Sequence, residues 1–203
     1  MSRNFAAALI RAVTGIRMIP AARCPPPPAI YFANHSSHLD FVSIWAALPP
    51  EIRARARPVA GRDYWCATPL RQRLATEFFR AVLIERQHVT VANNPLAPMV
   101  AAVAAGDALI VFPEGTRSTD GRVHEFKPGL YHLASAHPAV PLVPVHLQNL
   151  NRILPKGDIL PVPLIASLFV GEPMHLAKGE TKAAFLARAR EAVEALGRTR
   201  QPA

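Results

Sequence analysis

The stretch ALIVFPEGTRS, residues 108–118, joins five consecutive apolar residues to a polar turn that carries two charges. A continuous apolar run of this length is typical of a strand buried on both faces of a sheet, because helices cover each face of a parallel sheet. Pro113 ends the strand, so Glu114 and Arg117 stand just beyond its carboxyl end. Ligands of α/β domains gather at such strand ends, and this loop is therefore a candidate binding site.

Short strands and amphipathic helices alternate on both sides of this stretch. Alternation of this kind predicts an α/β domain. The strands are expected at 29–33, 58–61, 82–84, 108–112, 142–147 and 165–170. The helices are expected at 37–47, 68–78, 94–106, 128–136 and 181–197. The second of these helices should turn Leu70, Leu74 and Phe78 toward the core, and a basic amphipathic helix is expected near the N-terminus.

The chain of 203 residues is long enough for one sizeable core and short for two domains. Half of its residues are hydrophobic and 18% are charged, a composition that excludes a disordered chain. We divide the chain into an amphipathic N-terminal segment at 1–24, a stiff proline linker at 25–28 and one domain at 29–203. Residues 1–24 either lie in a membrane interface or pack on the domain core, and the sequence leaves both open.

Positive charge dominates the sequence, with 23 Lys and Arg against 14 Asp and Glu, a formal net charge of +9. Such a field attracts nucleic acid, an anionic membrane face, an acidic carrier protein or a phosphorylated substrate. Only 7% of the residues are aromatic and no nucleic-acid motif is recognised, which disfavours nucleic acid. The chain has two cysteines, Cys24 and Cys66, and their spacing matches neither a disulfide framework nor a metal-binding motif. A reducing, cytoplasmic setting is therefore expected. No run of 18 apolar residues exists, so a membrane-spanning helix is not expected.

The segment NHSSHLD, residues 34–40, follows the first expected strand and holds two histidines and an aspartate. A hydroxyl becomes nucleophilic near neutral pH when a histidine takes its proton and a carboxylate orients that histidine. If a helix begins near Ser37, Asp40 lies in its first turn and can reach back to His35. His38 faces away from the strand end. We therefore predict His35 as the base and Asp40 as its partner, while a helix cap formed by Ser37 and Asp40 is the alternative and is compatible with this role.

Three basic side chains stand where they can hold an anion. Arg117 offers a planar fork of donors suited to a phosphate or carboxylate, and Gly115 permits close approach of the backbone. Arg86 leaves a strand end, and Lys127 precedes a helix N-terminus, which is itself an anion site. Glu114 repels an anion unless it pairs with an arginine or accepts a hydrogen bond from a substrate hydroxyl. Taken singly, each of these residues also fits a solvated surface position.

Four segments of the chain follow one another in a particular order and spacing. NHSSHLD at 34–40 comes first, then IER at 84–86, FPEGTRS at 112–118 and VPLVPV at 140–145. Together they resemble the four motifs of the lysophospholipid and lysophosphatidic acid acyltransferase family, the glycerolipid acyltransferases defined by a His-x-x-x-x-Asp motif. The agreement runs from about residue 29 to residue 175, which covers most of the chain.

The resemblance implies a mixed, largely parallel sheet flanked by helices. It also implies that His35, held by Asp40, deprotonates a glycerol hydroxyl for direct attack on an acyl thioester, without an acyl-enzyme. The acceptor is then a lysophospholipid, with lysophosphatidic acid giving phosphatidic acid. The donor is acyl-CoA or acyl-carrier protein, with no other cofactor and no metal. The resemblance implies that Glu114, Gly115 and Arg117, helped by Arg86, hold the phosphate or glycerol of the acceptor. We predict that Thr116 and Lys127 also bind this substrate.

A protein of this family is expected to be cytoplasmic and peripheral on the inner face of the cell membrane. Its partners are then an anionic membrane surface, the two substrates and an acyl-carrier protein if that is the donor, with no nucleic acid. Two other functions stay open at the level of sequence. A metal-dependent hydrolase would use His35, His38 and Asp40, whose side chains are of metal-ligating types. A non-enzymatic basic adaptor would use the +9 charge to bind an anionic membrane or nucleic acid.

Overall fold

The computed structural model describes residues 2–20, 23–37, 39–86, 90, 93–150 and 166–198. The strands are β1 (Arg17–Pro20), β2 (Ala29–Ala33), β3 (Ala56–Gly61), β4 (Val82–Ile84), β5 (Ala108–Val111), β6 (Leu142–Gln148) and β7 (Ser167–Val170). They form one seven-stranded sheet in the order β1-β7-β6-β2-β5-β3-β4. All neighbours run parallel except β6 and β7, which are antiparallel. The expected mixed, largely parallel sheet is confirmed.

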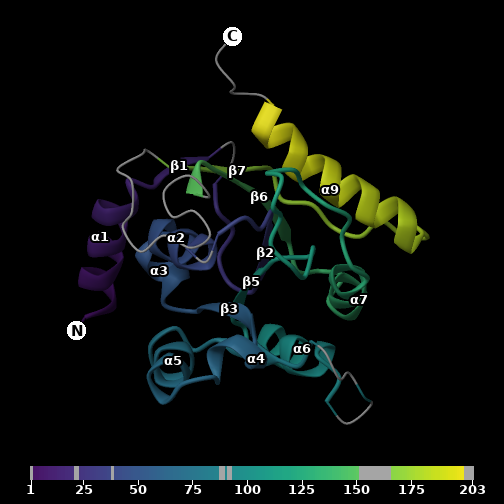
Figure 1. Cartoon of the computed structure of the whole chain (residues 1–203). Coiled ribbons are helices and arrows are strands. Elements are labelled where there is room, and N and C mark those ends of the chain that lie inside the picture. The colour runs from purple at the N-terminus through teal and green to yellow at the C-terminus, as the bar shows by residue number, and fades with distance from the viewer. Residues whose placement is uncertain are drawn as a thin grey trace.

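Helices cover both faces of this sheet (Figure 1). They are α1 (Arg3–Thr14), α2 (Asp40–Ala47), α3 (Pro50–Arg53), α4 (Arg62–Trp65), α5 (Pro69–Arg73), the π-helix η1 (Leu74–Phe78), α6 (Leu96–Ala104), α7 (Gly129–Ala136) and α9 (Lys182–Arg198). Alternate residues of the central strands point to opposite faces. Tyr31 and Ile110 pack in a core cluster with residues of α1 and α2. Phe32 and Val111 pack in a second cluster with residues of α6, α7 and α9.

The strand expected from the apolar run is β5, which lies between β2 and β3 inside the sheet. All residues of β2 and β5 are buried. Burial on both faces explains why neither strand alternates between polar and apolar residues. Phe32 of β2 pairs with Val111 of β5 in a parallel register, so the loops that follow these two strands leave the sheet side by side.

The N-terminal segment contains the expected helix, α1. Ala7 is buried against α2, whereas Phe5, Leu9 and Val13 are exposed. The chain then adds β1, which pairs in parallel with β7 at the edge of the sheet. The proline linker at 25–28 therefore does not separate the N-terminal segment from the domain. Strand β1, which lies within 1–24, belongs to the same sheet as the strands of the domain. Among the described residues, no helix is both long enough and apolar enough to cross a membrane.

The helix expected from residue 37 begins later, at Asp40. The Asp40 carboxylate accepts hydrogen bonds from the backbone N–H groups of Ser36 and Ser37, which holds these residues in a loop rather than in a helical turn.

The helix expected at 94–106 occurs as α6, and that expected at 181–197 occurs as α9. The last expected strand is β7, which begins at Ser167, and Ile165 lies outside the described residues.

The helix expected at 68–78 begins as predicted, with a Thr68 cap, but it continues from α5 into η1. The prediction that Leu70 and Leu74 face the core is wrong, since these residues are 79% and 43% exposed. Phe78, the third predicted residue, does pack against the core, with its ring centroid 5.6 Å from that of Trp45. Phe79 makes a further core contact. Its ring packs edge-on against those of Phe41 and Trp45, with centroids 5.1 and 5.2 Å apart. Aromatic packing by the residue after the π-turn therefore decides which side of this segment is buried.

Candidate active site

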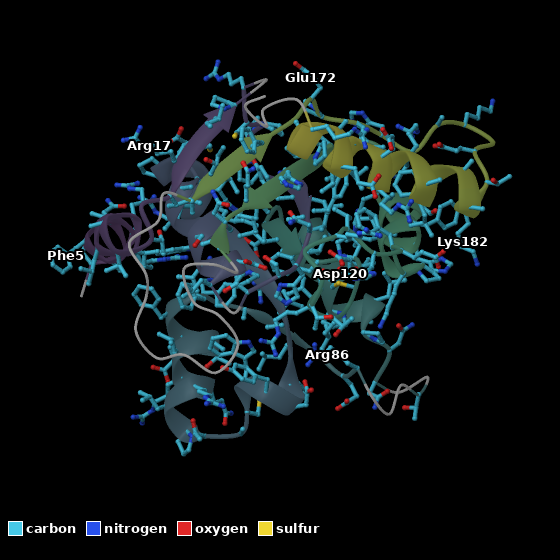
Figure 2. The ribbon with its side chains drawn as sticks, turned by 45° about the horizontal axis from the view of Figure 1, so that its top comes forward. Phe5, Arg17, Arg86, Asp120, Glu172 and Lys182 are labelled. Atoms are coloured by element: carbon cyan, nitrogen blue, oxygen red, sulfur yellow. The ribbon has the colours of Figure 1, made fainter. Side chains whose placement is uncertain are left out.

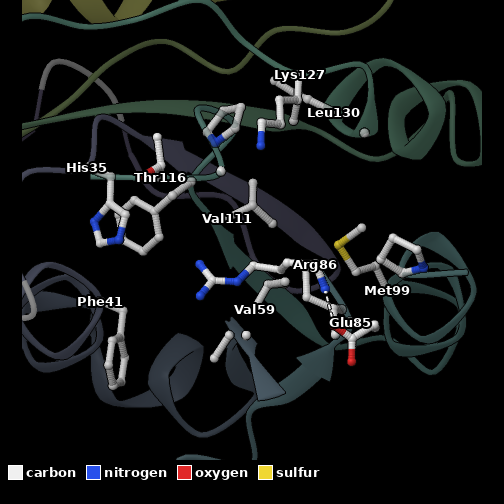
Figure 3. A pocket seen from close by; sticks show the side chains of 18 of the residues that line it. His35, Phe41, Val59, Glu85, Arg86, Met99, Val111, Thr116, Lys127 and Leu130 are labelled. Atoms are coloured by element: carbon white, nitrogen blue, oxygen red, sulfur yellow. Dashed lines mark hydrogen bonds between the residues drawn. The ribbon is translucent and has the colours of Figure 1, made fainter. Parts of the chain in front are cut away.

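The two polar loops predicted to form a site meet at the carboxyl edge of the sheet. Residues 34–37 follow β2 and residues 112–118 follow β5, and these strands are hydrogen-bonded parallel neighbours. A cavity of about 450 Å³ lies beside them. His35 lines one end of it, and basic and apolar side chains line the rest (Figure 3). Residues of both loops therefore border the same cavity, as the sequence predicts.

His35 and Asp40 form the predicted pair. His35 Nδ1 lies 2.8 Å from Asp40 Oδ2, and the Asp40 side chain is fully buried. The same oxygen accepts hydrogen bonds from the backbone N–H groups of Ser36 and Ser37 at 2.6 and 2.8 Å. Three donors thus converge on one carboxylate oxygen in the first turn of α2, where negative charge is favourable. Asp40 thus orients the histidine and holds the loop that precedes α2. The cap predicted from Ser37 does not form, because the helix is preceded by Leu39 and the Ser37 hydroxyl accepts a hydrogen bond from the backbone N–H of Leu39 at 3.3 Å.

This geometry gives the two ring nitrogens of His35 different roles. A carboxylate at Nδ1 makes that nitrogen a donor, which leaves the lone pair of Nε2 free to take a proton. The imidazole is 21% exposed and lines the cavity. The pair can therefore act as a general base whose charge, once the ring is protonated, is balanced by Asp40.

Glu114 does not lie where the resemblance assigned it. The side chain is only 3% exposed and does not line the cavity. Its Oε1 accepts a hydrogen bond from the backbone N–H of His35 at 2.8 Å, and Oε2 accepts one from that of His124 at 3.1 Å. Burial raises the pKa of Glu114 above its ordinary value, against the opposing effect of these two N–H groups. The carboxyl group is bound to the backbone and is not part of the cavity lining.

Arg86 lines the cavity as predicted, but its guanidinium is already paired with Asp63. Nη2 of Arg86 lies 2.9 and 2.7 Å from the two carboxylate oxygens, and Nε lies 3.3 Å from one of them. The two paired side chains lie directly against Gly61. A Cβ atom on residue 61 would lie only 2.2 Å from Arg86 Nε. Hydrogen bonding to Arg86 lowers the pKa of Asp63 below its ordinary value. Gly61 therefore makes room for the ion pair at the cavity.

Lys127 and Arg117 complete the basic lining of the cavity. Lys127 passes across Gly115, which has a φ of +70° and where a Cβ would come within 2.7 Å of Nζ. In Figure 3 the Lys127 ammonium points into the cavity, across from Arg86. Within the described ranges, neither Lys127 nor Arg117 has an ion-pair partner. The residues predicted to hold the acceptor that do line the cavity are Arg86, Gly115, Thr116, Arg117 and Lys127.

Much of the remaining lining is apolar. It includes Met99 of α6, Val111 of β5 and both Leu130 and Leu133 of α7. Figure 3 shows Met99 at the end of the cavity opposite His35. The cavity thus joins a basic region near the histidine to an apolar region, which suits an amphiphilic ligand.

Sequence reasoning missed Asp63 and the contact made by Phe112, whose ring stacks on that of His35 with centroids 4.3 Å apart. Asp63 stands two residues beyond the end of β3. Its position as a charged residue after a strand could have marked it as a candidate site residue. The second histidine of the metal alternative is His38, which lies outside the described residues. In the ranges that are described, no group of three or more His, Cys, Asp or Glu could hold a metal ion.

A family model described as Acyltransferase matches residues 11–148. The chain is 34% identical over 146 residues to a 1-acyl-sn-glycerol-3-phosphate acyltransferase of Limnanthes douglasii, which covers 67% of this chain and 47% of the relative. It is 31% identical over 136 residues to 1-acyl-sn-glycerol-3-phosphate acyltransferase alpha of Homo sapiens, which covers 66% of this chain and 45% of the relative. The chain therefore spans about half the length of the curated relatives it matches.

A solved structure shares the fold. The crystal structure of the 1-acyl-sn-glycerophosphate (LPA) acyltransferase PlsC from Thermotoga maritima matches with a TM-score of 0.74 and 22% sequence identity. The match covers 99% of this chain and 83% of that chain. Both polar loops of the site, 34–37 and 112–118, lie within the range matched by the family model.

Proposed function

Because the chain belongs to the acyltransferase family, we propose that it transfers a fatty acyl group from an acyl thioester to the free hydroxyl of a lysophospholipid. The proposed acceptor is lysophosphatidic acid and the product is phosphatidic acid, in keeping with the names of the relatives. The observation that carries the proposal is the 2.8 Å contact between His35 and a buried Asp40 beside a cavity with basic and apolar lining.

The proposed reaction is one direct transfer. Nε2 of His35 takes the proton of the acceptor hydroxyl while the hydroxyl oxygen attacks the carbonyl carbon of the thioester. The carbon–sulfur bond then breaks, and the leaving sulfur takes the proton from His35, which regenerates the base. Asp40 balances the imidazolium between the two proton transfers. A base placed in this way contributes roughly 10²- to 10⁴-fold to the rate.

The basic lining supports a phosphorylated acceptor. Arg117 and Lys127 bring positive charge that no acidic side chain among the described residues balances, and Arg86 adds a guanidinium that is shared with Asp63. The oxygens of a phosphate monoester match such donors, and an arginine can bind two of them at once. The Thr116 hydroxyl lines the same cavity and can donate a further hydrogen bond.

The apolar lining supports an acyl chain as the second ligand. The donor is proposed to be acyl-CoA or acyl-carrier protein, since both carry a thioester on an anionic body that a chain of net charge +9 attracts. Holding donor and acceptor together can lower the barrier by up to roughly 7–11 kcal/mol, because a bimolecular step becomes effectively intramolecular. The proposed chemistry uses these co-substrates and no other cofactor.

The helix α1 supports a peripheral position on the inner face of the membrane. Phe5, Leu9 and Val13 are 61, 50 and 52% exposed, and Phe5 projects away from the body of the molecule in Figure 2. Exposed apolar side chains beside Arg11 suit the boundary between headgroups and acyl chains of an anionic leaflet. Changing Phe5 and Leu9 to Ser together should weaken cosedimentation with phosphatidylglycerol vesicles. Unaltered vesicle binding would contradict this placement.

Acyl transfer from a labelled long-chain acyl-CoA to lysophosphatidic acid in detergent micelles tests the proposed activity. Wild type should form phosphatidic acid, and His35→Ala should lower the rate by at least about 10²-fold. His175→Ala makes the same change at an exposed histidine and should keep the wild-type rate. Full transferase activity in His35→Ala would refute the mechanism. Folded wild type that acylates no lysolipid with either donor would favour the basic adaptor.

A further inference from the structure

The loop after β5 holds His35 from three directions. The ring of Phe112 stacks on the imidazole, with planes inclined by 23°. Glu114 accepts a hydrogen bond from the backbone N–H of His35, and the backbone N–H of Ser118 donates to the His35 carbonyl at 2.7 Å. The ring, the N–H and the C=O of one residue are therefore all bound by residues 112–118.

The register of the sheet explains why Glu114 meets His35. Phe32 and Val111 are paired residues of β2 and β5, and His35 and Glu114 each lie three positions beyond them. The second carboxylate oxygen of Glu114 accepts from the backbone N–H of His124 at 3.1 Å. Glu114 thus ties the loop after β2 to the segment that leads into α7.

Burial determines what the Glu114 carboxyl group can contact. Its side chain does not line the cavity, whereas its neighbours Pro113 and Gly115 do. Both of its oxygens accept from partly buried backbone N–H groups, which would lose this acceptor if the carboxyl group were removed. These contacts are those of a group that fixes a loop.

We infer that Glu114 is a positioning residue that fixes the backbone of His35, and with it the direction of the imidazole, and that it does not bind the acceptor. Glu114 affects catalysis in this way only if His35 is the base proposed above. Acceptor affinity then depends on the cations that line the cavity, and Glu114 governs turnover. Displacement of a reacting group by about 1 Å can cost about 10²-fold in rate.

Two substitutions separate positioning from acceptor binding. Glu114→Gln keeps one acceptor oxygen but sets an amide NH₂ against a backbone N–H, and Glu114→Ala removes both acceptors. We expect kcat to fall about tenfold for Gln and about 10²-fold for Ala, with the KM for lysophosphatidic acid within about twofold of wild type. Glu172→Gln, at an exposed glutamate (Figure 2), should leave both constants unchanged. A raised KM with kcat preserved, or no change in either constant, would overturn the inference.

A spectroscopic measurement tests the same contacts independently of catalysis. In protein labelled with ¹⁵N-histidine, the backbone amide resonances of His35 and His124 report the two hydrogen bonds to Glu114. Both resonances should move in Glu114→Gln and stay in place in Glu172→Gln. If His35→Ala kept full activity, the proposed base would be wrong, and these resonances would still decide whether Glu114 holds the loop. Unmoved resonances in a folded Glu114→Gln protein would overturn the inference.

Discussion

Two pairs of ionisable side chains at the cavity are held in opposite ways. Asp40 of the His35 pair is fully buried, and backbone N–H groups fix its carboxylate. In the Arg86 and Asp63 pair the side chains are 38 and 32% exposed, and their strongest contacts are with each other. A buried, backbone-bound pair keeps one geometry, whereas an exposed ion pair exchanges readily with water and other ions. The proposed base is thus held in one position, while the arginine proposed to face the acceptor can adjust.

Asp40→Asn should disrupt the fixed pair and have the largest effect. Three donors converge on Asp40 Oδ2, and an asparagine in its place presents one acceptor atom and one NH₂ group. We expect kcat to fall about 10²- to 10⁴-fold, because a neutral amide cannot balance the charge of the protonated imidazole. The free energy of unfolding should fall by about 1.5–3 kcal/mol through lost hydrogen bonds to a charged group. Steady-state kinetics and thermal unfolding measure both, and a kcat within tenfold of wild type would show that this geometry is not required.

Asp63→Asn makes the same chemical change in the exposed pair and is the matched control. It releases the Arg86 guanidinium from its counter-ion, so the KM for lysophosphatidic acid should fall. An exposed ion pair contributes about 0.2–1 kcal/mol, which limits the change to about fivefold, with kcat nearly unchanged. The acyl-transfer assay measures both constants. A loss of kcat as large as that in Asp40→Asn would remove the contrast between the two pairs.

The Asp63 pair also gives stability a dependence on pH. Arg86 holds the pKa of Asp63 below its ordinary value. A carboxyl group with a lowered pKa in the folded state adds stability above its ordinary titration range, and this contribution is lost as the pH falls through the lowered pKa. The difference in unfolding midpoint between wild type and Asp63→Asn should therefore be present at neutral pH and disappear in strong acid.

The sheet and the contact between His35 and Asp40 were predictable because short stretches of sequence encode them. An apolar run that ends at Pro113 has few alternatives to a buried strand, and it became β5. Asp40 follows His35 by five residues at the start of a helix, so the two side chains are close in space whatever the rest of the chain does. Local geometry was sufficient for both.

Contacts between distant segments were not predictable in the same way. The direction of Glu114 depends on the register between β2 and β5, which no single segment contains. Asp63 and Arg86 are 23 residues apart and meet only because β3 and β4 are neighbours in the sheet. The exposed position of Leu70 follows from packing around η1, where tertiary contacts outweigh the helical pattern.

The equal spacing of His35 and Glu114 from their paired strand residues makes the two loops a matched set in length. One inserted residue in either loop would move one partner by about 3.8 Å along the chain, more than the 2.8 Å hydrogen bond between them can absorb. Exchange of one loop with that of a related chain should therefore succeed only when the three-residue spacing from the strand is kept. The parallel register thereby sets a design rule for remodelling this edge of the sheet.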